Sequence, residues 1–161
     1  MDFKIGSKAV YPRQGVTEVL GIETKEIMGS KQDFYVLRVL DTKQNIYIPV
    51  AKVTQVGLRE VMDRKSVQQV YDILQGHASR GGHGNWNRRY RAYNDKLNTG
   101  SAVEIAEVLR DLNRLKSDKN LSFGERKMLD TARRLLVQEL SVAEKASEAD
   151  VEGRIEACFG I

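Results

Sequence analysis

The chain has 161 residues, and its 26 lysine and arginine residues exceed its 22 aspartate and glutamate residues by four. A hydrophobic content of 41% and a charged content of 30% are ordinary for a soluble protein, and the length allows one domain or two small ones. No run approaches the roughly 18 apolar residues of a membrane span, and the N-terminus lacks the features of a signal peptide. We therefore expect a cytoplasmic protein.

The first 60 residues have the pattern of strands. Four segments, 9–11, 16–22, 34–40 and 45–50, are rich in β-branched or aromatic residues and are separated by turn-forming residues. Because no helical segment lies between them, we predict a small antiparallel β-barrel or a strongly bent sheet over residues 1–60. Alternation places Tyr35, Leu37 and Val39 on one face, and we expect the other face to be partly exposed.

From Ser66 onwards the apolar residues recur with helical spacing. Each of four helices is expected to begin at a serine cap that is followed three residues later by a capping-box partner or a close variant. These caps are Ser66, Ser101, Ser122 and Ser147. No helix can bury its apolar stripe alone, so we predict a compact all-α domain over residues 61–161.

The residue types of a metal site or an active site are scarce in this chain. Cys158 is the single cysteine, and the two histidines, His77 and His83, lie in a predicted loop without a nearby carboxylate. Core filling or solvent exposure explains each of the three, and the glycines around His83 form no phosphate-binding motif. We expect no metal, no cofactor and no enzymatic activity.

The entire charge excess lies between Gly76 and Gly100. This segment has five basic residues and one acidic residue, whereas the positive and negative charges of the remaining chain cancel. It contains a glycine-rich loop and then a predicted helix, with Asn85 as its cap. Trp86, the only tryptophan, shares one helical face with Tyr90, Tyr93 and Leu97. Arg88, Arg89 and Arg91 surround it in sequence.

Two interpretations of this basic segment are open. Basic residues around an aromatic residue at a helix N-terminus suit DNA binding, which needs phosphate neutralisation and a flat group that stacks on or wedges between bases. Alternatively, Trp86 covers the helical core and the arginines form a solvated face, with Arg91 and Asp95 as a surface ion pair. Three or four phosphate contacts would bind DNA only weakly, so the first interpretation requires a partner that holds the protein on DNA.

Segments in both halves of the chain carry a resemblance to a known family. They read VYP at 10–12, QGV at 14–16, FYVLR at 34–38, IPV at 48–50, VGLR at 56–59, WNRRYR at 86–91, AEVLRDL at 106–112 and ERKML at 125–129. In their order and spacing they resemble the CarD/CdnL family of bacterial transcription regulators. The similarity runs essentially from end to end, and the short form without a tail is most similar to the CdnL proteins of myxobacteria.

For residues 1–60 the resemblance implies a Tudor-like (SH3-like) barrel that binds the β subunit of RNA polymerase. The implied mode is strand addition, in which two sheet edges pair through main-chain hydrogen bonds. Lys25, Tyr47, Ile48 and Pro49 match the family's contact surface, and Tyr47 stands where some members have a basic residue. A proline suits an edge strand because it has no N–H to donate to a further strand.

For residues 61–161 the resemblance implies contact with promoter DNA at the upstream edge of the transcription bubble, near the −10 element. Trp86 matches the family's minor-groove wedge, and Arg88, Arg89 and Arg91 match its basic surroundings. The implied function is stabilisation of the open complex formed with the primary sigma factor. We expect a monomer that is associated with the nucleoid through RNA polymerase. The alternatives are a protein-interaction adaptor without DNA contact and an independent DNA-binding repressor.

Overall fold

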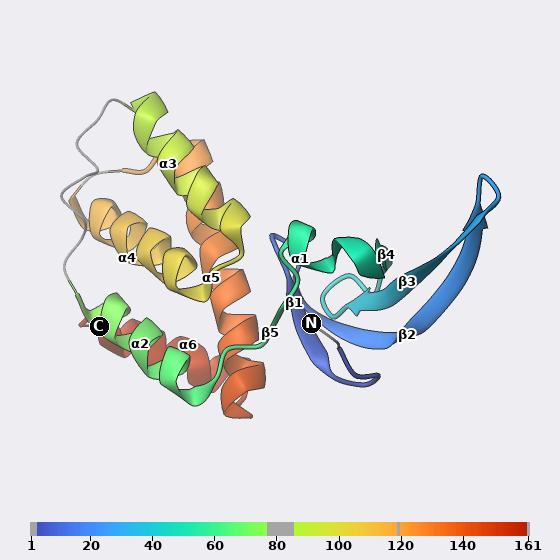
Figure 1. The fold of residues 1–161 in the computed structure, drawn as a ribbon. Coiled ribbons are helices and arrows are strands. Elements are labelled where there is room, and N and C mark those ends of the chain that lie inside the picture. Colours follow the sequence, from blue (N-terminus) through green and yellow to red (C-terminus); the bar gives the residue numbers. More distant parts are fainter. Residues whose placement is uncertain (1–2, 77–85, 119, 161) are drawn as a thin grey trace. The chain divides into compact units, whose positions relative to one another are not determined.

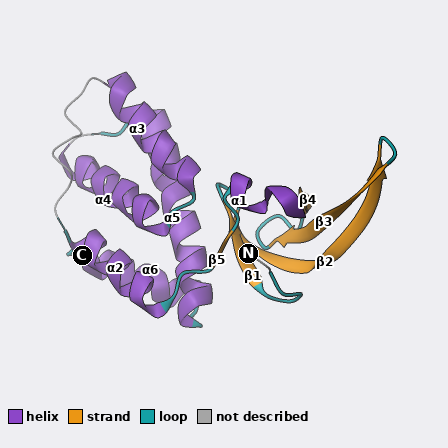
Figure 2. Cartoon of the chain, in the orientation of Figure 1, coloured by secondary structure: helices purple, strands orange, loops and turns teal. Residues whose placement is uncertain are grey.

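A computed structural model describes residues 3–76, 86–118 and 120–160 of the chain (Figure 1). Contacts divide the chain into two compact units, Met1–Val61 and Met62–Ile161. The described strands all lie in the first unit, and the second unit is built from helices (Figure 2). The predicted fold class, an antiparallel β unit followed by an all-α unit, is confirmed. Within the described ranges no helix combines the length and apolar character of a membrane span.

The first unit is a five-stranded antiparallel sheet in the order β4-β3-β2-β1-β5. Its strands are β1 (Lys8–Tyr11), β2 (Gly15–Ile27), β3 (Ser30–Val39), β4 (Asn45–Pro49) and β5 (Arg59–Glu60). In the described part of the unit β4 and β5 are edges that do not pair with each other, so the sheet is open and not a closed barrel. Its core consists of Phe3, Ala9, Val19, Tyr35, Leu37, Ile48, Val53 and Leu58.

Strands β2 and β3 form a longer hairpin than the sequence pattern predicts. Their pairing continues to Ile27 and Ser30, and the two-residue turn at Met28 and Gly29 has φ angles of 52° and 81°. Positive φ at both central residues is the type I′ geometry that matches the twist of a hairpin. Residues 22–33 are exposed, so this part lacks the apolar alternation that marks a half-buried strand. Figure 1 shows the hairpin extending away from the rest of the sheet.

Residues 50–60 contain elements that the sequence pattern does not predict. A short 3-10 helix, η1 (Val50–Lys52), leads into α1 (Val53–Val56), and β5 then pairs with β1. Gly57 ends α1 with a φ of 82°, in the left-handed region that favours glycine. Each of these elements is only two to four residues long, which is too short for a helical or strand period to be recognised.

The second unit consists of five helices within its described residues. They are α2 (Arg64–Gln75), α3 (Trp86–Thr99), α4 (Ala102–Asp118), α5 (Phe123–Glu144) and α6 (Glu148–Cys158). Their apolar faces meet in one core, whose largest fully buried side chains are Leu74, Leu97, Leu109, Leu112, Leu136, Leu140 and Ile155. Each helix thus buries the stripe that it could not bury alone, as the sequence pattern indicates.

Three of the four predicted serine caps are confirmed. In each, the serine hydroxyl accepts the backbone N–H of the residue three positions later; these serines are Ser101, Ser122 and Ser147. The fourth prediction is wrong because α2 begins at Arg64 and its cap is Asp63, which accepts the N–H of Ser66 at 2.8 Å. That hydrogen bond lowers the pKa of Asp63, and Ser66 lies inside the first turn. The predicted cap Asn85 lies outside the described residues.

A buried carboxylate holds the beginning of the second unit. Glu139 on α5 is 3% exposed, and its Oε2 accepts the backbone N–H of Met62 at 2.8 Å. Glu139→Ala is expected to lower the free energy of unfolding by about 1–3 kcal/mol, because a buried donor loses its acceptor. Urea denaturation measures this loss. Glu139→Gln keeps an oxygen acceptor and is the matched control; equal losses in both variants would contradict this role of the hydrogen bond.

Candidate functional sites

Strand alternation sorts the predicted polymerase-contact residues of β4 onto two faces of the sheet. Ile48 lies opposite Tyr35 in the β3–β4 register, and both are 2% exposed members of the core cluster. Because successive side chains of a strand point to opposite faces, Tyr47 and Pro49 point to the outer face. The side chain of Ile48 therefore belongs to the core, and Tyr47 and Pro49 are the residues of β4 that are placed to contact a partner through their side chains.

Lys25 and Tyr47 come together although β3 lies between their strands. The Lys25 Nζ is 3.9 Å from the centroid of the Tyr47 ring, which is within the range of a cation–π contact. Tyr47 is 44% exposed, and Lys25 is exposed as well. At the position where some family members carry a basic residue, this chain thus has an aromatic ring that holds the ammonium group of another strand.

The outer side of β4 is a sheet edge. β4 pairs with β3 on one side and is the terminal strand in the described sheet order. Unpaired N–H and C=O groups of such an edge can add a strand from another chain. Pro49 is the last residue of β4, so it ends this edge without an N–H group. The edge and the outer face that carries Tyr47 and Lys25 form one continuous candidate surface.

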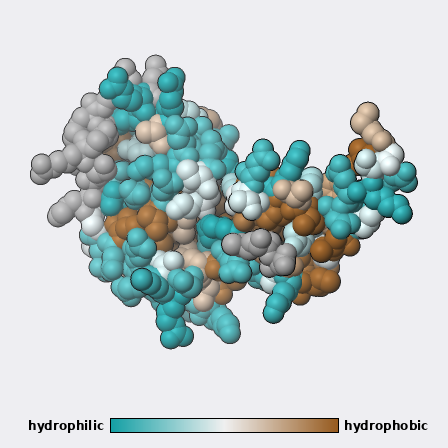
Figure 3. All heavy atoms as spheres, in the orientation of Figure 1, coloured by the Kyte–Doolittle hydropathy of each residue, from teal (hydrophilic) through white to brown (hydrophobic). Residues whose placement is uncertain are grey.

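The outer face of β3 and the β2–β3 hairpin widen this surface. Val36 lies opposite Tyr47 and is half-buried, although it was not among the predicted contact residues. The alternation of residues 35–39 signalled it, since that pattern predicts a partly exposed second face. On the hairpin, Ile27 and Met28 are 43% and 100% exposed, and hydrophobic residues are visible on the first unit in Figure 3. Ile22 is 55% exposed but lies opposite Tyr35, so it is on the other face of the sheet. Exposed apolar groups beside a strand edge favour a protein partner.

The predicted apolar face of α3 loses its cover toward the N-terminus of the helix. Leu97 is 0% exposed, Tyr93 is 8% exposed and Tyr90 is 37% exposed. Trp86 is the first residue of α3, but its side chain lies outside what the structure describes. The core of the second unit therefore supports the C-terminal half of α3 more firmly than the half in which the basic residues lie.

The three arginines predicted to surround the wedge have different environments. Arg88 and Arg91 are exposed. Arg89 is turned toward α5, where its Nη2 lies 3.8 Å from Oε2 of Glu125, and the two side chains are 18% and 3% exposed. The structure thus brings Arg88 and Arg91 to the surface of α3 and separates Arg89 from them.

Charges of both signs gather around Tyr93. Burial raises the pKa of the Tyr93 hydroxyl, the carboxylate of Asp111 adds to this rise, and the guanidinium of Arg89 opposes it. Asp111 accepts a hydrogen bond from Nε of Arg110 at 2.9 Å, and these two side chains are 7% and 12% exposed. The middle of α3 is therefore packed against α4 and α5 through a partly buried charge cluster.

The beginning of α5 presents residues of the same types as α3. Phe123 is 77% exposed in its first turn, and Arg126 and Lys127 are exposed just beyond it. The contact between Glu125 and Arg89 places this turn beside the N-terminal half of α3. Charge counts along the sequence do not reveal this basic and aromatic turn, because residues 101–161 have ten basic and twelve acidic side chains and therefore a negative net charge.

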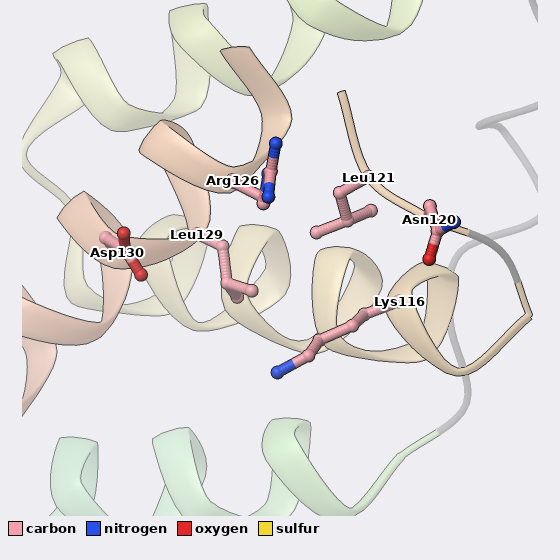
Figure 4. A pocket seen from close by; sticks show the side chains of 6 residues that line it. All are labelled: Lys116, Asn120, Leu121, Arg126, Leu129 and Asp130. Carbon is pink, nitrogen blue, oxygen red and sulfur yellow. The ribbon is translucent and has the colours of Figure 1, made fainter. Parts of the chain in front are cut away.

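A cavity of about 640 Å³ lies between the end of α4 and the first half of α5 (Figure 4). It is lined by Lys116, Asn120, Leu121, Arg126, Leu129 and Asp130, and Figure 4 shows that these come from α4, the connecting segment and α5. Two cations against one carboxylate make the lining positive. Among the described residues there is no group of three or more histidine, cysteine, aspartate or glutamate side chains that could hold a metal ion.

Comparison with known proteins finds matches in both units. The family model of the CarD-like/TRCF RID domain matches residues 3–62, and that of the CarD C-terminal domain matches residues 69–156. The chain belongs to the CarD family. A CarD-family relative from Bacillus subtilis (strain 168), named "Putative transcription factor YdeB", is 36% identical over 156 residues, which cover 93% of this chain and 97% of that protein.

Two solved structures of CarD-family N-terminal domains are also similar in sequence to this chain. CdnLNt from Myxococcus xanthus is 56% identical, with a TM-score of 0.34, and the match covers 38% of this chain and 87% of that one. The N-terminal domain of Myxococcus xanthus CarD is 34% identical, with a TM-score of 0.32, and the match covers 37% of this chain and 79% of that one. The predicted family is confirmed by the two domain models and the Bacillus relative.

Proposed function

We propose that this CarD-family protein is a transcription regulator that binds the β subunit of RNA polymerase and stabilises the promoter open complex. The sheet of the first unit is the proposed polymerase-binding part, and the start of α3 is the proposed DNA-contacting part. The observation that carries the proposal is the open outer edge of β4, with Tyr47 and Lys25 on the adjoining face. It occurs within the match to the CarD-like/TRCF RID domain.

Strand addition at β4 would provide binding affinity and would fix how far the partner strand pairs along the edge. A strand of the β subunit that pairs with this edge would form main-chain hydrogen bonds up to Pro49, where the missing N–H stops the ladder. The ammonium of Lys25, which rests on the Tyr47 ring, would favour acidic residues beside that strand. Val36 and Pro49 add apolar area on the same face.

The proposed DNA contact is a wedge at the edge of the melted region. Trp86 begins α3, where the apolar face of the helix is losing its cover, and Arg88 and Arg91 are exposed for contact with phosphates. Opening a base step for an apolar wedge costs a few kcal/mol. At the upstream edge of the bubble the bases are already unstacked, so most of this cost is absent. The wedge therefore favours the open complex over the closed one.

A weak DNA contact is enough for this function. When polymerase holds this protein at the promoter, the effective concentration of the protein near the DNA is raised. The contact with DNA then forms within one complex. A preference of about 1.4 kcal/mol for the open state changes the ratio of open to closed complexes tenfold. The small charge excess of the chain, confined to residues 76–100, is compatible with this arrangement. The primary sigma factor is an indirect partner, because it forms the bubble that the wedge occupies.

Two measurements test the proposal with the full chain. The first is a pull-down with an isolated β lobe, and binding is expected. The second is the lifetime of open complexes formed by polymerase and the primary sigma factor on a linear promoter fragment after a heparin challenge, which the chain is expected to lengthen. Lobe binding without a longer lifetime would support the adaptor alternative. Tight, sequence-specific DNA binding by the chain alone, without lobe binding, would support the repressor alternative.

A further inference from the structure

We propose that Arg89 is a positioning residue, which orients the first turns of α3 against α5, and that it does not contact DNA phosphates. The proposal rests on the proposed function of α3 as a DNA contact. It changes the role that the sequence assigns to one of three neighbouring arginines. Arg88 and Arg91 remain the candidates for phosphate contact. Glu125 contributes indirectly to DNA binding by holding Arg89, although its own negative charge would repel phosphates.

The orientation of the Glu125 carboxylate is set by the start of α5. Its Oε1 accepts the N–H of Ser122 at 3.1 Å, and the N–H of Glu125 donates to the Ser122 hydroxyl at 3.2 Å, which completes a capping box. The other oxygen, Oε2, faces Nη2 of Arg89 at 3.8 Å. A carboxylate that is 3% exposed and held by its own helix cap is a fixed anchor for the guanidinium group of another helix.

The surrounding charges favour the position of the Arg89 guanidinium beside the Glu125 carboxylate. Arg89 and Arg110 face two carboxylates, Asp111 and Glu125, around Tyr93, and all four charged side chains are at most 18% exposed. Removing one partner from such a cluster leaves a charge that is poorly hydrated and uncompensated. An Arg89 side chain that swung out to a phosphate would leave the Glu125 carboxylate in that state. Contact with Glu125 is therefore favoured over contact with DNA.

The ion pair acts where apolar packing on α3 becomes weaker. Leu97 and Tyr93 are buried, but Tyr90 is 37% exposed, so the turns that precede it have less apolar support. Arg89 lies in these turns, and its contact with α5 ties them to the second unit. The direction in which the first turn of α3 leaves the helical core is set by this contact.

The test compares Arg89→Gln, Glu125→Gln and the control Arg91→Gln in binding of the full chain to a fluorescein-labelled fork-junction DNA at several KCl concentrations. Loss of a phosphate contact reduces the slope of log Kobs against log salt by about 0.9, which among these three variants is expected only for Arg91→Gln. Arg89→Gln is expected to weaken binding about threefold to tenfold with an unchanged slope, as typical coupling energies indicate. Glu125→Gln keeps the capping oxygen and is expected to weaken binding similarly, although it makes the chain more positive.

The outcomes separate the positioning role from simple electrostatics. An Arg89→Gln variant with a reduced slope, or a Glu125→Gln variant that binds DNA as well as or better than the parent chain, would overturn the proposal. The double variant Arg89→Gln/Glu125→Gln should bind the fork DNA no more weakly than the weaker of the two single variants, because both substitutions remove the same contact. Arg89→Lys is the further variant if Arg89→Gln unfolds, because it keeps the charge that a phosphate needs but shortens the reach to Glu125; weaker binding with an unchanged slope supports the proposal, and binding and anisotropy equal to those of the parent chain overturn it.

A readout without DNA separates failure of this inference from failure of the proposed function. Trp86 is the only tryptophan, so its fluorescence anisotropy reports on the first turn of α3. Arg89→Gln and Glu125→Gln are expected to lower this anisotropy, and Arg91→Gln is expected to leave it unchanged. If the parent chain does not bind the fork, the DNA contact is refuted, while the anisotropy still decides whether Arg89 positions α3. Unchanged anisotropy in both variants would overturn the positioning role.

Discussion

Replacing Trp86 with alanine is expected to shorten the lifetime of the promoter open complex about tenfold, since one aromatic–base stacking contact contributes about 1–3 kcal/mol. The loss should fall on the open complex alone, because the wedge has no place in closed DNA. Binding to the β lobe should be unchanged, since the proposed polymerase surface lies in the first unit. Heparin-challenge kinetics on a linear promoter fragment, with and without the variant, measure the effect.

Trp86→Phe is the matched control because it keeps a smaller flat ring. An intermediate lifetime is expected for this variant, which distinguishes stacking from the loss of an unrelated contact. Urea denaturation of both variants should reproduce the midpoint of the parent chain. A Trp86→Ala variant that unfolds would show that the residue belongs to the helical core, and one that retains the full lifetime would refute the wedge.

Replacing Pro49 with arginine is expected to abolish recruitment to polymerase, with a loss of affinity of about a hundredfold or more, since misplaced charge at an interface costs several kcal/mol. Pro49 is half-buried at the end of β4, on the outer face that carries Tyr47. An arginine there adds a long charged side chain close to Lys25, and it restores an N–H where the ladder should stop. Co-purification with the β lobe measures the effect.

Pro49→Ala is the control for this substitution because it removes the ring without adding charge. A modest loss of affinity is expected, since the edge backbone of β4 remains available for pairing. Tyr47→Phe is expected to retain binding, because it preserves the ring that contacts Lys25 at 3.9 Å. A Pro49→Arg variant that folds and still co-purifies with the β lobe would show that the edge of β4 is not the contact.

Much of the fold could be predicted from local patterns. Capping serines at 101, 122 and 147 mark the beginnings of three helices, because the backbone donors of a helix start need a nearby acceptor whatever the tertiary context. Alternation at Tyr35, Leu37 and Val39 predicted the buried face of β3, which the structure confirms. These signals are local, so a single sequence is enough to recognise them.

Elements without a local period were missed. The distal half of the β2–β3 hairpin is exposed, so no apolar alternation distinguishes it from a loop. β5 has two residues, and its strand conformation depends on pairing with Ala9 and Val10 of β1. The sequence predicts Ser66 as the cap of α2, whereas the cap is Asp63, because both residues are good acceptors and only the folded backbone decides between them.

For the predicted site residues, too, some properties follow from the sequence and others depend on the folded structure. Sequence alone established the residue types: a tryptophan among arginines at a helix start, and a strand that ends in proline. Tertiary packing decided which of them face outward. Arg88, Arg89 and Arg91 are equivalent by charge and proximity, but Arg88 and Arg91 are exposed, whereas Arg89 meets a buried carboxylate from a helix more than thirty residues away in sequence.

The charge excess of four and its confinement to residues 76–100 are properties of the sequence, and so is the family to which the chain belongs. What the sequence could not determine is how much of that charge reaches the surface. The charge of Arg89 is balanced inside the second unit by Glu125, and the cation of Lys25 is brought onto the ring of Tyr47 from another strand. Ion pairs and cation–π contacts depend on distances in space, which only the packed structure sets.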